Sequence, residues 1–190
     1  EILKLVGSNR TKAEGLFFPD TFYFDRNTAD TVILQRSYDA MQSKLDAAWQ
    51  KRAPNLPYKN SYEALIMASI VEKETGKASE RPMIAGVFIN RLRVGMRLQT
   101  DPTVIYGMGV EYQGNIRKKD LLKDTPYNTY TRDGLPPTPI AMPGLAAIEA
   151  ALHPETTKAL YFVGKGDGSH AFSNSLQEHN RAVVKYQLKK

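Results

Sequence analysis

The segment "ALIMASIVEKETG", Ala64–Gly76, is the part of the sequence that best predicts the fold. Its first eight residues, Ala64–Val71, are apolar but for one serine, and a helix that is apolar on all sides is enclosed by protein. The segment then ends in Glu72, Lys73 and Glu74, followed by a glycine, which commonly closes a helix by taking the left-handed conformation. We therefore predict a central buried helix whose last turn carries two acids and a base.

The two acids of this turn cannot act together. At about 100° per residue, Glu72 and Glu74 point about 200° apart. A carboxylate in the last turn of a buried helix faces the negative end of the helix dipole and loses hydration, and both effects favour its protonated form. Such a group can serve as a general acid. In the alternative, one glutamate pairs with Lys73 or Arg81 and the other is solvated at a frayed helix end.

The remaining pattern predicts a single α+β domain over residues 1–190, with several helices packed with a few short β-strands and long ordered loops. Asn60 and Glu63 predict a capping box that opens the central helix. Residues 96–143 are rich in Gly, Pro, Tyr, Thr and Asn, which favours short strands and long ordered loops. We expect further helices at 27–52, 79–93 (closed by Gly95), 118–123, 144–152 and 176–188, and two short strands within 159–173.

Composition excludes several classes of function. A net charge of +6 permits a polyanionic partner. However, the basic residues are scattered, and the clusters at 117–119 and 189–190 are typical of a solvated face, so no nucleic acid partner is predicted. The absence of cysteine rules out thiol catalysis. The three histidines lack metal-ligand spacing, so no metal is predicted, and no apolar run approaches the about 20 residues that span a bilayer.

Two polar stretches are candidates for binding. "RLQTDPTVIYG", Arg97–Gly107, and "YNTY", Tyr127–Tyr130, combine amides, hydroxyls and aromatic rings. These groups suit a sugar polymer, because they can bond ring hydroxyls while the aromatic rings lie against apolar sugar faces. The alternative is ordinary turn chemistry, since Asp101-Pro102 and Asn128 are common turn formers. The sequence "GKGDG", 164–168, lacks the P-loop spacing and predicts a hairpin turn.

Several motifs together resemble one protein family, the endolytic murein transglycosylases of the YceG-like (MltG) family. The resemblance covers nearly the whole chain, and the uninterrupted block Ala78–Gly107 makes it specific. The stretches that carry it are "EGLFFPDTFYF" (14–24), "MASIVEKET" (67–75), "ASERPMIAGVFINRLRVGMRLQTDPTVIYG" (78–107), "YNTY" (127–130), "GLPPTPIAMPG" (134–144), and "LYFV" leading to "HAF".

The resemblance implies a lytic transglycosylase that cuts the MurNAc-β-1,4-GlcNAc bond within peptidoglycan glycan strands and leaves 1,6-anhydro-MurNAc ends. It places the catalytic acid on the second glutamate of "EKE", Glu74, and implies no cofactor. The expected substrate-binding residues are Glu72, Gln99, Asp101, Thr103, Tyr106, Tyr127, Asn128 and Tyr130. The competing hypothesis is a non-catalytic peptidoglycan-binding or assembly module.

The resemblance also implies a location and partners. Family members carry an N-terminal membrane helix and a small LysM-like module, which we expect to precede this chain. The implied location is the bacterial inner membrane, with a single-pass anchor and the catalytic domain on the periplasmic, extracytoplasmic side. The implied partners are peptidoglycan glycan strands and peptidoglycan synthases (penicillin-binding proteins), with membrane contact only through the preceding anchor.

Overall fold

The computed structural model describes residues 1–188, so the predicted basic cluster at 189–190 lies outside the described part of the chain. Within it, helices and one two-stranded sheet form the predicted α+β domain. The helices expected at 27–52, 79–93, 118–123 and 144–152 are present close to the predicted bounds. In chain order the main elements are α1 (Ile2–Leu5), α2 (Asp30–Gln50), α3 (Ser61–Glu74), α4 (Arg81–Arg93), α5 (Asp101–Met108), α6 (Lys118–Leu122), α7 (Leu145–Leu152), β1 (Tyr161–Gly164), β2 (His170–Ser173) and α8 (Leu176–Val183).

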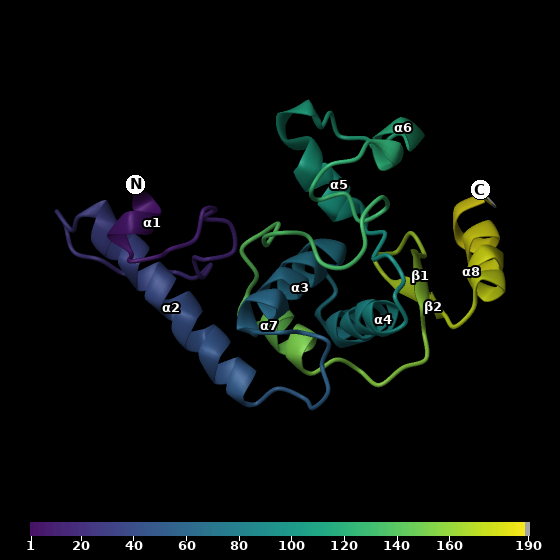
Figure 1. The fold of residues 1–190 in the computed structure, drawn as a ribbon, viewed down its shortest axis with the longest axis horizontal. Coiled ribbons are helices and arrows are strands. Elements are labelled where there is room, and N and C mark those ends of the chain that lie inside the picture. Colours follow the sequence, from purple (N-terminus) through teal and green to yellow (C-terminus); the bar gives the residue numbers. More distant parts are fainter. Residues whose placement is uncertain (189–190) are drawn as a thin grey trace.

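Helix α3 is the centre of the domain, as predicted. It packs against α2, α4, α5 and α7, and Figure 1 shows it between the long α2 and the α4 helix. Every residue from Ala64 to Val71 is buried. The serine in this run is satisfied, because the Ser69 hydroxyl donates to the Ile66 carbonyl at 2.7 Å and accepts from the Ile140 amide at 2.9 Å. The helix is therefore rigidly enclosed up to its last turn.

The two ends of α3 were predicted in position but not in every detail. The Asn60 side chain accepts from the Glu63 amide at 3.1 Å, as a cap should. The Glu63 carboxylate, however, bonds the amide of Lys59 at 2.7 Å, so the return contact of the capping box is made one residue earlier than predicted. At the other end, Thr75 leaves the helix with extended backbone (φ −145°). Gly76 has no positive φ, so the expected left-handed closure is wrong.

Helix α4 ends as predicted at a left-handed glycine. Gly95 has φ +71°, and the amides of Met96 and Gly95 bond the carbonyls of Arg91 at 2.8 Å and Leu92 at 3.3 Å. These two contacts form a Schellman motif, which satisfies carbonyls that the helix end leaves free. The motif turns the chain sharply, and the segment that follows leads into Thr100 and α5.

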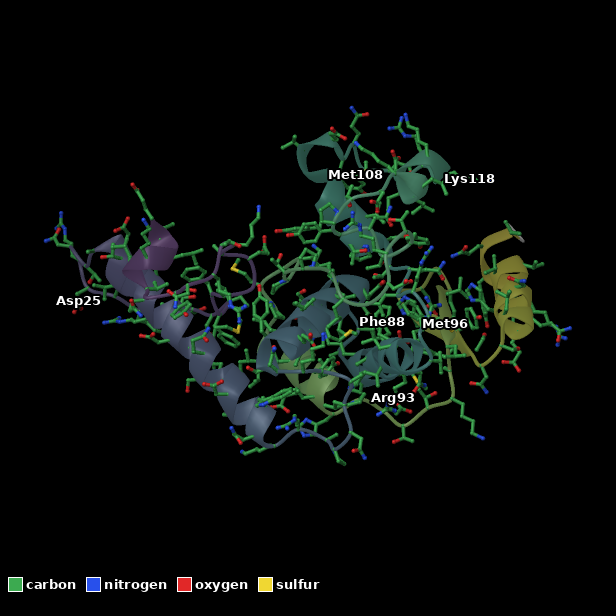
Figure 2. The ribbon with its side chains drawn as sticks, in the orientation of Figure 1. Asp25, Phe88, Arg93, Met96, Met108 and Lys118 are labelled. Carbon is green, nitrogen blue, oxygen red and sulfur yellow. The ribbon has the colours of Figure 1, made fainter. Side chains whose placement is uncertain are left out.

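The expectation of short strands in residues 96–143 is wrong. The described chain forms helices α5 and α6 there and no strand. Thr100-Asp101-Pro102 is a helix start rather than a turn, because proline is tolerated in the first helical turn and an acid there suits the helix dipole. The α5–α6 part projects from the body (Figure 1), and Met108 and Lys118 mark it in Figure 2. The long ordered loop is found after α6.

The C-terminal part contains the predicted hairpin. Strands β1 and β2 pair antiparallel, with Phe162 opposite Phe172, and the glycine-rich segment 164–168 forms their turn, closed by the Lys165 amide and the Ser169 carbonyl at 2.8 Å. The final predicted helix divides into α8 and a π-helical segment, Val184–Leu188. Among residues 1–188, none of the helices has the length and apolar character to cross a membrane.

Candidate active site

The two acids at the end of α3 point to different surroundings, as their spacing predicted. Glu72 Oε1 pairs with Arg81 at 3.1 Å, and Oε2 accepts from the Gly144 amide at 3.0 Å. Gly144 is the N-cap of α7, so Glu72 places a negative charge at the start of that helix. The pairing with Arg81 that we considered as an alternative is thus correct for Glu72. Because both of its oxygens bond to protein, Glu72 ties α3 to its neighbours, and its expected role in substrate binding stays a prediction.

Glu74 is the acid whose protonation the fold alters. Its side chain is partly exposed, and the Thr100 hydroxyl donates to its Oε1. Burial raises the pKa of Glu74 to about 7. The Thr100 hydrogen bond opposes this increase in pKa, the nearby Asp101 charge adds to it, and His170 and Arg91 oppose it more weakly. Near neutral pH the group can therefore both give and take a proton.

Two other threonines, Thr103 and Thr129, hold the backbone of Thr100 and so fix its hydroxyl. Thr103 Oγ1 donates to the Thr100 carbonyl at 2.7 Å, so in its 2.8 Å contact with Thr129 Oγ1 it must accept. Thr129 Oγ1 in turn accepts from the Thr100 amide at 3.1 Å. All three residues are buried. The Thr100 backbone is thus held at both its amide and its carbonyl, and its hydroxyl points to Glu74. Because this hydroxyl donates to Oε1, the neutral acid carries its proton on Oε2.

Three of the predicted residues lie close to Glu74 or next to Thr100, which bonds it, and are accessible. Gln99 and Asp101 are exposed, on either side of Thr100, and Tyr130 is partly exposed. The Tyr130 hydroxyl donates to Asp101 Oδ1 at 2.6 Å. Gln99 has a φ of +48°, which is uncommon for a residue other than glycine and which clusters at functional sites. The structure therefore places the Asp101 carboxylate and the Tyr130 phenol around Glu74, with Gln99 next to Thr100 in the chain.

Two predicted binding residues are buried and do not fit that role. The Thr103 side chain belongs to the threonine cluster. Asn128 is fully buried; its amide nitrogen donates to the carbonyls of Leu121 and Lys123, and its oxygen accepts from the Tyr130 amide. Both residues were predicted to bind substrate because their side chains are polar. In the structure these side chains bond buried backbone groups and do not face solvent.

Tyr106 and Tyr127 form a separate aromatic pair. Their ring centroids are 4.7 Å apart, and the Tyr127 hydroxyl bonds that of Thr138 at 2.8 Å. Burial raises the pKa of Tyr106 to about 12. Tyr106 follows Asp101 by five residues on α5, so it points about 140° away from it. The pair therefore does not join the group of polar residues around Glu74.

Sequence reasoning missed four residues near Glu74: Thr100, Thr129, Arg91 and His170. Thr100 and Thr129 lie within the two polar stretches 97–107 and 127–130. The sequence alone does not distinguish a threonine in a buried hydrogen-bond network from a threonine in a turn. Arg91 carried a usable signal, because it continues the apolar spacing of Ile84 and Phe88 on a buried helix. No group of three or more His, Cys, Asp or Glu side chains within residues 1–188 is arranged to hold a metal ion.

An α+β domain with one glutamic acid of raised pKa at the end of its buried central helix defines a candidate acid–base enzyme. The chain belongs to the YceG-like family, whose model matches residues 3–185. It is 41% identical over 174 residues to an endolytic murein transglycosylase of Bacillus subtilis, covering 91% of this chain and 48% of that protein. It is 33% identical over 183 residues to an endolytic murein transglycosylase of Streptococcus pneumoniae, covering 93% of this chain and 33% of that protein.

The fold is shared with a solved structure. The crystal structure of a yceG-like protein from Listeria monocytogenes superposes with a TM-score of 0.79 at 37% identity, covering 95% of this chain and 62% of that one. The chain thus spans about half the length of the B. subtilis relative and about a third of the S. pneumoniae relative.

Proposed function

We propose that this chain is the catalytic domain of an endolytic peptidoglycan lytic transglycosylase. It would cleave the MurNAc-β-1,4-GlcNAc bond within glycan strands and leave 1,6-anhydro-MurNAc ends. Family membership and the names of the relatives support this activity. The observation that carries it is Glu74, an acid with a pKa raised to about 7 that is flanked by exposed polar side chains.

In the first step, protonated Glu74 donates to the glycosidic oxygen. The C1–O bond breaks as positive charge develops on the MurNAc ring, and the GlcNAc that follows it in the strand leaves with the transferred proton on its C4 hydroxyl. Because Thr100 occupies Oε1 as a donor, the transferred proton comes from Oε2. The Thr100 hydroxyl remains hydrogen-bonded to the carboxylate that forms, which stabilises its charge.

In the second step, the Glu74 carboxylate takes the proton of the MurNAc C6 hydroxyl as that oxygen attacks C1. The new C6–O–C1 bond gives the 1,6-anhydro product, Glu74 is again protonated, and no water is consumed. Ordinary glycosidases need a second carboxylate as nucleophile or base. Here the substrate supplies the nucleophile, so a single carboxylic acid that titrates near neutral pH is sufficient.

The exposed residues beside Glu74 are proposed to hold the sugars. The Gln99 amide and the Asp101 carboxylate can bond hydroxyl and acetamido groups, and the Tyr130 ring can lie against a sugar face. Glu72, Thr103 and Asn128 would act indirectly, by fixing α7 and the loops that carry the contact residues. Tyr106 and Tyr127 would contact only glycan units farther from the cleaved bond.

Location and partners follow from the same proposal. An enzyme that cuts peptidoglycan acts outside the cytoplasm, on the glycan strands of the cell wall. We propose that an anchor in a preceding segment holds the domain at the membrane and that it works beside peptidoglycan synthases, where new glycan strands are made.

The proposal is tested on purified murein with the Glu74→Gln variant, which keeps the shape of the side chain and removes its acid. Mass analysis of the products is expected to show internal cuts with anhydro ends for the unmodified chain and a loss of at least about 100-fold in rate for the variant. The matched control is Glu111→Gln, an exposed glutamate on the projecting part. Wild-type rates of anhydro-ended product from Glu74→Gln would overturn the proposal, and murein binding without cleavage by the unmodified chain would favour the binding module.

A further inference from the structure

Arg91 is a buried cation without a carboxylate partner. It lies in the last turn of α4 with 7% of its surface exposed. No Asp or Glu within residues 1–188 forms an ion pair with Arg91. By contrast, a carboxylate pairs with each of four other arginines: Arg81, Arg97, Arg117 and Arg132. A buried charge is costly unless it is paired or fully hydrogen-bonded. Its retention in the interior therefore calls for a physical reason.

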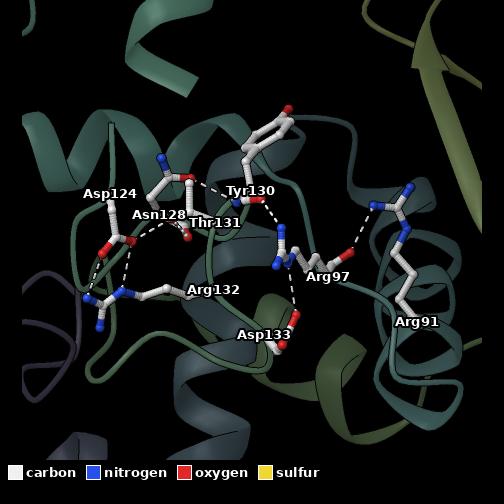
Figure 3. Close-up of polar contacts among 8 residues, drawn as sticks. All are labelled: Arg91, Arg97, Asp124, Asn128, Tyr130, Thr131, Arg132 and Asp133. Atoms are coloured by element: carbon white, nitrogen blue, oxygen red, sulfur yellow. Dashed lines mark hydrogen bonds and ion pairs between the residues drawn. The ribbon is translucent and has the colours of Figure 1, made fainter. Parts of the chain in front are cut away.

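Three backbone carbonyls from two other segments hold the guanidinium group. Arg91 Nε donates to the Leu160 carbonyl at 2.6 Å, just before β1, and Nη1 donates to the carbonyls of Leu98 at 2.7 Å and Arg97 at 3.4 Å. Figure 3 shows the contact between Arg91 and Arg97. The planar fork of donors fits this set as a lysine could not. Arg91 thus joins α4, the hairpin and the segment that leads to Thr100.

This contact acts on the site through the backbone. Leu98 is two residues before Thr100, whose hydroxyl donates to Glu74. The neighbouring Arg97 side chain bonds Asp133 at 2.9 Å and the Tyr130 carbonyl at 2.9 Å, as Figure 3 also shows. A shift at Arg91 would therefore reach both Thr100 and the loop that carries Tyr130.

The charge of Arg91 also acts on Glu74. The guanidinium lowers the pKa of Glu74, although burial raises it more. The other charged or titratable groups that face Glu74 come from different elements: Asp101 of α5 raises its pKa, while His170 of β2 lowers it. The neighbouring Tyr130 hydroxyl itself has a raised pKa and stays neutral beside Glu74. Arg91 is thus a permanently charged group that favours the Glu74 carboxylate.

We propose that Arg91 is a positioning residue of the reaction, which sets the contact between Thr100 and Glu74 and stabilises the carboxylate formed when Glu74 gives up its proton. The inference rests on the proposed function. It assigns a role to a residue that is 7% exposed and whose Nε and Nη1 donate to backbone carbonyls, so that it acts on the reaction through Thr100 and Glu74.

The test compares kcat and KM as functions of pH for Arg91→Met, Arg91→Lys and a control, Arg93→Met. Arg93 lies two residues further on α4, is exposed, and bonds one backbone carbonyl, that of Asn55; it is labelled in Figure 2. For Arg91→Met we expect kcat to fall about 10- to 100-fold with little change in KM, since small misplacements of a reacting group have effects of this size. At high pH kcat falls as Glu74 loses its proton, and this basic limb of the pH profile should move to higher pH in Arg91→Met. The reason is that the Arg91 charge is lost and the Thr100 contact is weakened, and both lower the pKa of Glu74.

The lysine variant separates position from charge. Arg91→Lys keeps the charge and loses the fork, so kcat should fall about tenfold while the basic limb moves less than in Arg91→Met. If Arg91→Met does not fold, Arg91→Lys decides alone, and wild-type kcat for it overturns the inference. A fall in kcat with an unmoved basic limb in Arg91→Met, or equal behaviour of Arg91→Met and Arg93→Met, also overturns it. Failure of the proposed function itself is seen separately, as unchanged activity of Glu74→Gln.

Discussion

Glu74 titrates near neutral pH because two opposed effects meet at one side chain. Removal from water raises its pKa, and the Thr100 hydroxyl, by donating to Oε1, lowers it. With burial alone the group would be a weaker acid, and with the hydrogen bond alone it would be ionised at neutral pH. The balance at about 7 suits a residue that must donate a proton in one step and accept one in the next.

The raised pKa predicts how stability depends on pH. The folded chain keeps the Glu74 proton up to about pH 7, whereas the unfolded chain loses it near the ordinary glutamate pKa of 4.5. The native state therefore binds more protons in this window, and its stability falls as pH rises through it. Urea unfolding should show Glu74→Gln and the unmodified chain to be similar below pH 4.5, and the variant to be more stable by about 1–3 kcal/mol at pH 8.

Glu111 provides the opposite control for this experiment. Its contact with Lys123 lowers the pKa of Glu111 in the folded chain. Its contribution is therefore present above its unfolded pKa and lost as pH falls, so Glu111→Gln should give no gain in stability at pH 8. A Glu74→Gln variant that is less stable than the unmodified chain at pH 8 would contradict the raised pKa of Glu74 in the folded chain.

Thr100 can be tested separately from the helix it begins. It is the N-cap of α5, but its side chain makes no capping bond and donates to Glu74 instead. Thr100→Val should therefore lower kcat/KM about tenfold, which corresponds to the about 1.4 kcal/mol expected for one such hydrogen bond. The basic limb of the pH profile of this variant should also lie at higher pH, because the lost bond lowers the pKa of Glu74. Thr100→Ser keeps the hydroxyl and should stay close to the unmodified chain. Equal activities of the two variants would show that the hydroxyl is not used.

The helices around the site end by different devices, and the difference matters for function. Helix α4 closes with a Schellman motif at Gly95, which aims residues 96–98 back at Arg91. Helix α3 ends without such a motif, since Thr75 simply becomes extended. The carbonyls of its last turn are therefore not covered by a glycine closure, and Glu74 lies at the bare negative end of the helix.

The two glycines that follow these helices should respond differently to alanine. Gly95 has φ +71° and open space around it, so Gly95→Ala carries only the backbone strain of the left-handed region, about 1 kcal/mol. Gly76 is also in open space but has no positive φ, so Gly76→Ala should be neutral or slightly stabilising. Thermal unfolding of both variants measures this. Equal losses of stability would contradict the difference in backbone conformation.

At the level of the whole molecule, α4 is pressed against the segment that joins α7 to β1. A Cβ on Gly86 would lie 2.5 Å from the Glu155 carbonyl oxygen and 3.0 Å from Thr157 Cγ2. Farther along the same helix, Asn90 donates to the carbonyls of Thr157 and Ala159 at 2.8 and 3.1 Å, and Arg91 donates to that of Leu160. One face of α4 thus aligns the segment 155–160, which leads into the hairpin and His170.

Gly86→Ala is expected to destabilise the domain by about 1–3 kcal/mol, the usual range for overpacking, although alanine is the better helix former. Adding Thr157→Ser removes the methyl group but not the carbonyl, so the double variant should recover only part of the loss. Chemical unfolding gives both numbers. A more stable Gly86→Ala variant would show that α4 and the 155–157 segment can separate without cost.

Several features followed from local sequence alone. The buried character of Ala64–Val71, the Asn60 cap, the Gly95 closure and the hairpin turn at 164–168 each depend on neighbours within a few residues. Patterns of apolar spacing, capping residues and glycine report such short-range choices directly. The 200° angle between Glu72 and Glu74 was of the same kind, since it needs only helical geometry.

Only the tertiary structure decided which polar residues meet. Asn128 and Asp101 both looked like polar turn formers, yet Asn128 is fully buried and bonds backbone carbonyls, whereas Asp101 is exposed near Glu74. Thr100, Arg91 and His170 come from separate elements and converge on Glu74 only after α3, α4 and the hairpin pack together. The physical reason is that burial and charge around a side chain are set by groups distant in the sequence, whereas helix ends and turns are set by groups within reach of one another along the chain.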